Sequence, residues 1–380
     1  MKTGIATIPL DYGKCPLWLF ERMKRLGRSI TLAIVEEFGP EEFLKRMADP
    51  VWFQSFGCVL GFDWNSSGLA TTTMGALKES LRGIENQLGI FICGGKGKTS
   101  KKTPEQIRQW GEFINLPPEK IEQIVYASKM SAKVDSTALQ DGFQIYHHNL
   151  IFTKKGEWNV VQQGMNIASQ QARRYHWLVS GVKDFVEEPH SGIISDLKVK
   201  PLNLTAKESK ENKNISSELV REEPGTFLKD MQLISESANS LFRQKRLPGF
   251  VQMELNNVEF DWHPVSIEKF DLNRLRKTIS KANFIKPKTF EELIRIEGVG
   301  PRTIRALSLV SEIIYGAKPS YEDPARYTFA HGGKDGTPYP VERETYDKVL
   351  NIIEKGIKKS NISLTEKEEA QKRFNNRFLK

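Results

Sequence analysis

The sequence contains little cysteine and no long apolar run. Its three cysteines, Cys15, Cys58 and Cys93, lie far apart, and none belongs to a CxxC pair. This pattern excludes a disulfide framework and a thiolate zinc site. No segment approaches the roughly 18 apolar residues of a membrane helix, and residues 1–10 lack the features of a secretory or transit signal. We therefore expect a soluble, cytoplasmic protein with no membrane partner.

Positive charge and apolar residues are well represented. Lys and Arg number 56 against 47 Asp and Glu, which gives a net charge of +9 and a pI near 9.2. This excess favours a polyanionic partner, and charge alone leaves nucleic acid and an acidic membrane surface open. The 380 residues include 21 Phe and 7 Trp, which is enough for a sizeable core and is typical of two domains.

A polar stretch without aromatic residues divides the chain. Residues 197–224 mix Lys, Glu, Asn and Ser without apolar periodicity, which predicts a flexible linker. Before it, residues 1–196 show helical spacing as far as about residue 130 and strand-like spacing after that. After it, residues 225–380 have mainly helical patterns. We predict an α+β fold, in which a helix-rich N-terminal domain with a small antiparallel sheet precedes a mostly α C-terminal domain.

The stretch EGVGPRTIRAL, residues 297–307, predicts a tight corner between two helices. Thr289 and Glu292 have the spacing of a capping box, which places the start of the first helix just after Thr289. Pro301 suits the first turn of a second helix, so the hairpin should span residues 290–314.

This corner resembles the helix-hairpin-helix motif of DNA repair glycosylases and nucleases. Glycines let a ligand approach the backbone, and the amides that open the second helix attract an anion such as a backbone phosphate. The resemblance implies DNA contacts from Gly298, Val299, Gly300, Arg302 and Thr303. A plain turn between two helices is the alternative.

Reactive side chains concentrate in residues 133–149, KVDSTALQDGFQIYHHN. If Thr153 pairs with Glu157 across a hairpin with glycine at position 156, His148 lies opposite Gln162 and His147 opposite Gln163. Adjacent strand residues face opposite sides, so only one of the two histidines can enter a given site.

These residues form the predicted catalytic site. Asp and His side chains suit an acid/base pair, or a divalent ion that activates water against a phosphodiester. The candidates are Asp135, Asp141, His147, His148 and Gln163, of which Asp135, Asp141 and His148 are the predicted ligands of Mg or Mn. The alternative is a set of hydrogen-bonded structural side chains.

Basic residues elsewhere are candidates for phosphate contacts. Lys96 and Lys98 lie in the glycine- and lysine-rich segment 94–103, and Arg173 and Arg174 precede stackable rings in RRYHW. The first segment is not a P-loop, because Ile92 stands where that motif requires glycine. No nucleotide cofactor is expected. Solvated charge, or arginines paired with acids, are the alternatives.

A glycosylase would require a catalytic carboxylate beyond the hairpin. Asp323 and Glu342 are the two candidates. Lyase members of the helix-hairpin-helix class carry a lysine beside the hairpin, and Arg302 occupies that region here. A guanidinium stays protonated and does not form a Schiff base, which argues against a lyase.

Several segments together resemble one prokaryotic family of unknown function, best represented in archaea. They are FGCVLGFDWNSSG, KVDSTALQDGFQIYHHN, VVQQGM, ARRYHW and FAHGGKDG. The resemblance covers nearly the whole chain and implies no activity. Our leading hypothesis is a DNA-binding, repair-type nuclease with residues 1–196 as its catalytic domain. A DNA glycosylase and a non-catalytic DNA-binding protein are the alternatives, and the oligomeric state is left open.

Overall fold

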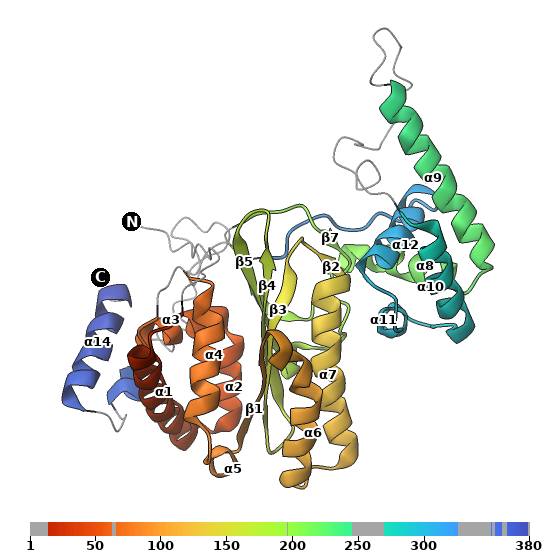
Figure 1. The fold of residues 1–380 in the computed structure, drawn as a ribbon. Helices are drawn as coiled ribbons and strands as arrows, with labels where there is room; N and C mark the ends of the chain where they lie inside the picture. The colour runs from red at the N-terminus through yellow and green to blue at the C-terminus, as the bar shows by residue number, and fades with distance from the viewer. Residues whose placement is uncertain are drawn as a thin grey trace.

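The computed structural model describes residues 14–62, 66–195, 197–244, 270–325, 351, 354–358 and 363–378. Figure 1 shows two lobes, a sheet covered by helices on both faces and a neighbouring bundle of helices. The fold is mixed α and β with a helix-rich N-terminal part and a mostly helical later part, as the sequence predicts.

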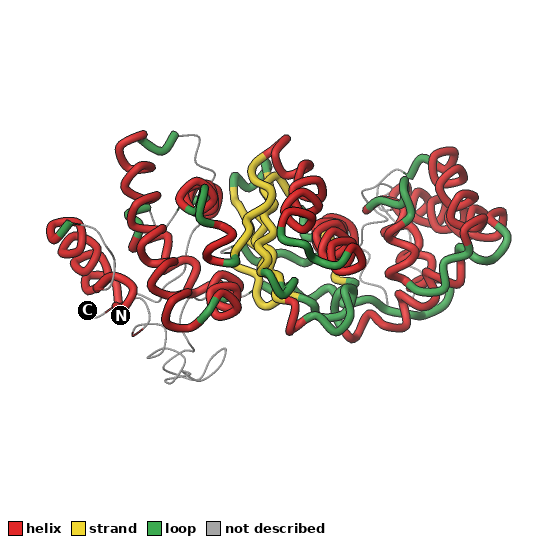
Figure 2. The backbone as a smooth tube through the Cα atoms, turned by 90° about the horizontal axis from the view of Figure 1, so that it is seen from below, coloured by secondary structure: helices red, strands yellow, loops and turns green. Residues whose placement is uncertain are grey.

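The central sheet has five antiparallel strands in the order β1-β3-β4-β5-β6. The strands are β1 (Ile90–Lys96), β3 (Gln144–Thr153), β4 (Trp158–Asn166), β5 (Gln171–Leu178) and β6 (His190–Ile194). Figure 2 shows this sheet as a thin layer between two layers of helices. All five strands are largely buried because both faces are covered.

Each face of the sheet has its own helices. One face is covered by helices α1 (Leu17–Phe38), α2 (Pro40–Ala48), α3 (Pro50–Val59), α4 (Gly68–Ser80) and α5 (Glu85–Leu88). Helices α6 (Thr103–Phe113) and α7 (Pro118–Thr137) cover the other. Because both faces are covered, side chains of β1 alternate between two cores. Ile90 and Ile92 pack in the core on the α1–α5 face, whereas Phe91 and Cys93 pack in the core on the α6–α7 face.

The β3–β4 hairpin has the predicted register. The Thr153 amide donates to the Glu157 carbonyl at 2.9 Å, and Gly156 takes the left-handed conformation with φ +78°. His148 therefore pairs with Gln162 and His147 with Gln163, as expected. The two histidines enter different layers of the molecule.

The predicted linker, residues 197–224, is folded. It contains β7 (Leu202–Asn203), which pairs with β2 (Leu139–Gln140), and helix α8 (Lys210–Leu219). Asn212 is buried and donates to the carbonyls of Ser308 (2.9 Å) and Ala317 (2.7 Å). The flexible-linker prediction was wrong because the buried polar side chains of this segment find partners about 100 residues away.

The bundle contains α8 together with α9 (Pro224–Gln244), α10 (Leu272–Ile285), α11 (Phe290–Arg295) and α12 (Pro301–Ile313). Half of the predicted capping box is present, because Thr289 Oγ1 accepts from the Glu292 amide. The Glu292 carboxylate accepts from the amide of Lys288, one residue before the Thr289 amide that a capping box uses. Buried apolar residues of the bundle are continuous with those under α7, so the two lobes share one hydrophobic core.

The end of the chain returns to the N-terminal helices. Helix α14 (Leu364–Phe378) lies beside α1 and α3 rather than in the bundle (Figure 1). Arg25 pairs with Glu366 at 2.6 Å, and Arg373 donates to the Val59 carbonyl at 3.2 Å. The predicted boundary of the C-terminal domain at residue 380 therefore extends too far.

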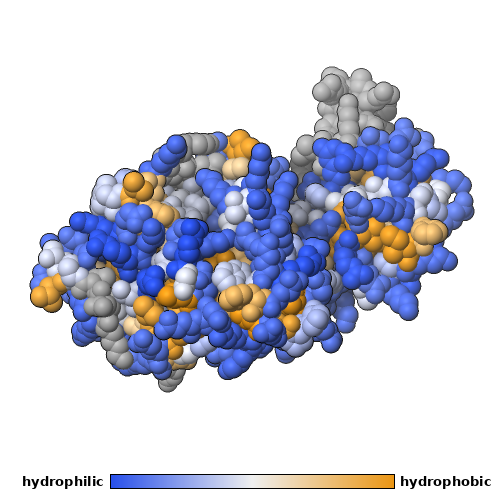
Figure 3. Space-filling view, turned by 60° about the horizontal axis from the view of Figure 1, so that its bottom comes forward, coloured by the Kyte–Doolittle hydropathy of each residue, from blue (hydrophilic) through white to orange (hydrophobic). Residues whose placement is uncertain are grey.

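The surface is mostly hydrophilic on the face drawn in Figure 3, with separate hydrophobic areas on both lobes. Within the described ranges, no helix combines the length and the apolar character that crossing a membrane would require.

Candidate nucleic-acid interface

The α11–α12 corner is built from residues that leave its backbone accessible. Gly298 has φ +95°, which favours glycine, and Gly300 is extended with φ −125°. A Cβ atom added at either glycine would meet no atom within 4 Å. Val299 is fully buried, and its carbonyl accepts from Lys133 Nζ on α7, which fixes the corner against the first lobe.

The start of α12 has unpaired amides. No side chain caps this helix, and among the described residues the amides of Arg302 and Thr303 have no hydrogen-bond partner. Arg302 is exposed, while the neighbouring acidic side chain, Glu297, pairs with Lys281 at 3.2 Å. Unpaired amides and the positive end of the helix dipole suit an anion.

A groove of about 530 Å³ runs from this corner toward β3. Its walls come from the corner, from α7 and from the 3₁₀ helix η1 (Gly97–Lys102). Its lining residues are Ser100, Lys101, Pro104, Ser128, Lys129, Ala132, Ser136, Phe143, Gln144, Ile145, His148 and Pro301. The described residues that line the groove include two lysines and no carboxylate, so the groove favours anionic groups.

The predicted basic contacts separate into two groups. Lys96 and Lys98 are exposed at the end of β1 and the start of η1, so their predicted phosphate contacts remain predictions. Arg173 and Arg174 are 0% and 1% exposed. Neither guanidinium can reach a phosphate on the surface, and that part of the prediction is corrected.

His148 lies in the floor of the groove and begins a buried polar chain. Its Nε2 lies 2.9 Å from Ser128 Oγ on α7, and its Nδ1 lies 2.8 Å from Gln162 Oε1 on β4. The Gln162 amide nitrogen donates to Asp135 Oδ2 and to the Ser131 carbonyl. Burial lowers the pKa of His148, although its bond to Gln162 and the charge of Asp135 oppose this effect. The imidazole is therefore neutral near pH 7.

Asp135 also holds a second histidine. Its Oδ1 lies 2.5 Å from His190 Nε2, and its Oδ2 accepts from Trp177 Nε1 at 3.0 Å. His190 lines a different cavity of about 440 Å³, whose rim carries Glu188, Glu208 and Glu322. The carboxylate of Asp135 thus connects two imidazoles that face two separate hollows.

The three predicted metal ligands do not form one set. Asp135 and His148 are joined through Gln162, whereas Asp141 contacts Arg173 and Tyr175. Across the described ranges, no group of three or more His, Cys, Asp or Glu side chains is arranged to hold a metal ion. The metal ion itself stays a prediction.

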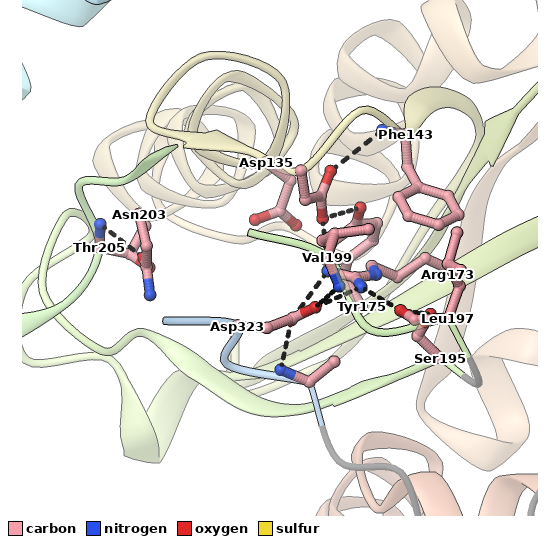
Figure 4. Close-up of polar contacts among 12 residues, drawn as sticks. Asp135, Phe143, Arg173, Tyr175, Ser195, Leu197, Val199, Asn203, Thr205 and Asp323 are labelled. Atoms are coloured by element: carbon pink, nitrogen blue, oxygen red, sulfur yellow. Dashed lines mark hydrogen bonds and ion pairs between the residues drawn. The ribbon is translucent and has the colours of Figure 1, made fainter. Parts of the chain in front are cut away.

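Arg173 occupies the centre of a buried ion-pair cluster (Figure 4). It contacts Asp141 at 3.0 Å and Asp323 at 2.8 Å, and it donates to the Leu197 carbonyl at 3.0 Å. Burial raises the pKa of Asp141 to about 6 despite the opposing effects of Arg173 and Tyr175. Asp323 also accepts from the amides of Val199 and Ala325.

This cluster corrects the predicted role of Asp323. Its carboxylate is buried and satisfied by Arg173, which leaves it no access to a sugar or a water nucleophile. Asp323 instead joins the segment after α12 to Arg173 on β5. Glu342, the other glycosylase candidate, lies outside the described residues.

His147 and Gln163 belong to the opposite face of the sheet. Burial, together with the neighbouring His148 and Lys96, lowers the pKa of His147 to about 3, and neither ring nitrogen has a partner among the described residues. Gln163 donates to Tyr146 and to the Ser67 carbonyl. Arg174, on the same face, donates to Gln54 and His176, and burial lowers its pKa to about 9. The predicted catalytic set is therefore split between two layers.

Sequence reasoning missed Ser128, Gln162 as a hydrogen-bonding partner, and His190. A usable signal existed for the first. Ser128, Ser131 and Asp135 have the i, i+3, i+7 spacing of one helix face. That face packs on β3 and β4, which carry His148 and Gln162. His190 could not be found in this way. It lies on β6, at the opposite edge of the sheet from β1, and its partner Asp135 lies 55 residues earlier in the sequence.

Comparison with known proteins gives a family without an activity. Searches of the curated proteins and of the solved structures returned no match. A family model described as "Protein of unknown function (DUF763)" matches residues 4–341. Because this match spans most of the sequence, the chain belongs to the DUF763 family.

Proposed function

We propose that this protein binds DNA through its phosphate backbone, at the α11–α12 corner and the adjoining groove. The observation that carries the proposal is the start of α12, where the unpaired amides of Arg302 and Thr303 directly follow Pro301, which lines a groove with two lysines and no carboxylate among its described lining residues. The likeness of this corner to helix-hairpin-helix motifs of DNA repair proteins supports the same partner. The net charge of +9 is opposite in sign to that of the DNA backbone, as phosphate binding requires.

The proposed reaction is phosphodiester hydrolysis, as in a repair-type nuclease. The groove leads from the proposed phosphate site to His148, which is a neutral imidazole and thus able to accept a proton. No described residue favours a glycosylase, because Asp323 is occupied by Arg173. If His148 had no chemical role, the same surface would support a DNA-binding protein without turnover.

DNA binding can be tested by fluorescence anisotropy with labelled single-stranded and duplex oligonucleotides. Arg302→Glu places a negative charge at the start of α12 and should weaken binding at least about 10-fold, with a shallower salt dependence. Lys318→Glu is the matched control, because Lys318 is exposed just beyond the other end of α12, about 20 Å away at the usual helical rise. Equal affinities for the two variants would contradict the proposed site.

A further inference from the structure

Ser128 and His148 are placed as a nucleophile and its base. Ser128 is the first of the three serines of α7, and its hydroxyl contacts the His148 ring at 2.9 Å. A helical serine commonly donates back to its own helix, as Ser217 does to the Lys213 carbonyl. Both Ser128 and His148 line the groove, although each is less than 5% exposed.

The surrounding hydrogen bonds fix the tautomer of His148. The Gln162 amide nitrogen faces two acceptors, Asp135 Oδ2 and the Ser131 carbonyl, so its oxygen faces His148. An amide oxygen only accepts, which requires the proton on Nδ1 of His148. Nε2 of the neutral ring is then the acceptor for the Ser128 hydroxyl. This direction is the one that a general base requires.

Asp135 acts on this pair through Gln162. Its carboxylate holds the amide nitrogen of Gln162, and this orients the carbonyl that accepts from His148. When the imidazole gains a proton at Nε2, the same carbonyl still accepts from Nδ1, and the carboxylate charge lies one side chain further away. Asp135 and Gln162 are therefore positioning residues.

The geometry points to a covalent hydrolytic site in which Ser128 is the nucleophile and His148 the general base, with a phosphodiester as substrate. Ser128 Oγ attacks phosphorus as its proton passes to His148 Nε2, and the bond to the departing sugar oxygen breaks. His148 returns the proton to that oxygen, which leaves a phosphate ester on Ser128. A water molecule, deprotonated by His148 Nε2, then attacks phosphorus, and the bond to Ser128 Oγ breaks. His148 returns the proton to Ser128 Oγ, and the second product leaves with the new P–O bond.

The substrate class rests on the proposed function and on the charge of the groove. Lys101 and Lys129 line it, and no carboxylate is found among its described lining residues, so an anionic phosphodiester is favoured over a neutral acyl substrate. The pairing of Ser128 with His148 does not depend on DNA binding. The two proposals can therefore fail separately.

An alkyl fluorophosphonate tests the pair directly, because it reacts with an activated serine by forming an O–P bond and releasing fluoride. Full-length protein is treated with the reagent, and the modified peptide is identified by mass spectrometry. We expect the adduct on Ser128. His148→Gln should slow labelling at least about 100-fold, the lower end of a general-base contribution. Ser217→Ala, the control, should label at the wild-type rate.

Bis(p-nitrophenyl) phosphate then tests the substrate class without DNA. We expect release of nitrophenolate that is lost in Ser128→Ala, with circular dichroism used to confirm that the variant is folded. Hydrolysis of p-nitrophenyl acetate alone would overturn the phosphodiester assignment. Absence of an adduct on wild-type Ser128, an adduct on Ser136 instead, or equal labelling of His148→Gln would overturn the nucleophile assignment, whatever the folding of the serine variant.

Discussion

Replacing Arg173 by methionine should strongly destabilise the protein. The Arg173 guanidinium contacts Asp141 and Asp323, and all three side chains are at most 1% exposed. Methionine keeps part of the aliphatic chain but leaves two buried carboxylates without their cation. Removing one partner of a buried ion pair typically costs about 3–5 kcal/mol. Such a loss would be a large fraction of the roughly 5–15 kcal/mol that keeps most proteins folded.

The assay is urea unfolding at pH 7, with Arg82→Met as the control. Arg82 pairs with Glu79 on the surface, where its side chain is 74% exposed, so its loss should cost less than about 1 kcal/mol. Arg173 also joins β5 to Leu197 and to Asp323 in the segment after α12, and Asp323 in turn accepts from the Val199 amide. Limited proteolysis of Arg173→Met should therefore cut these connecting segments first. Equal stability of the two variants would refute the proposed role of the cluster.

Two further predictions concern acid stability and the corner. His147 stays neutral when folded, because burial lowers its pKa from the ordinary 6.5 to about 3. Its contribution to stability is therefore complete above pH 6.5 and is lost as the pH falls, by about 2 kcal/mol at pH 5. His147→Phe should therefore flatten the fall in unfolding free energy between pH 6.5 and 4, and an unchanged slope would contradict this. Gly298→Ala should cost about 1–2 kcal/mol in thermal unfolding because of its positive φ, whereas Gly300→Ala should cost less than half of that; equal losses would contradict the assignment.

Local patterns in the sequence predicted the parts of the fold that local interactions determine. The β3–β4 register follows from the loop at Gly156, and that register places His148 beside Gln162. The α11–α12 corner follows from the N-cap Thr289, the conformation of Gly298 and the fixed φ of Pro301. In each case the determining residues lie within about a dozen positions of one another.

Interactions between distant residues account for the failures. Polar residues such as Asn212 led to the prediction of a flexible linker at residues 197–224. The partners of Asn212 are carbonyls 96 and 105 residues away. Arg173 looked like a phosphate contact, but it pairs with Asp323, 150 residues further along. A single sequence contains no signal for such distant partners. It could predict that histidines and carboxylates gather near β3, but not which of them line the same groove or cavity.

The central claim is that main-chain amides at the start of α12 bind a DNA phosphate. Gly300→Leu tests it most directly, because Gly300 is extended and a Cβ added there meets no atom within 4 Å, so the fold should be retained. The added side chain would cover the amides without changing the charge. Anisotropy titration with duplex DNA at fixed salt should show at least about 10-fold weaker binding. An unchanged affinity in a folded Gly300→Leu variant would contradict the account.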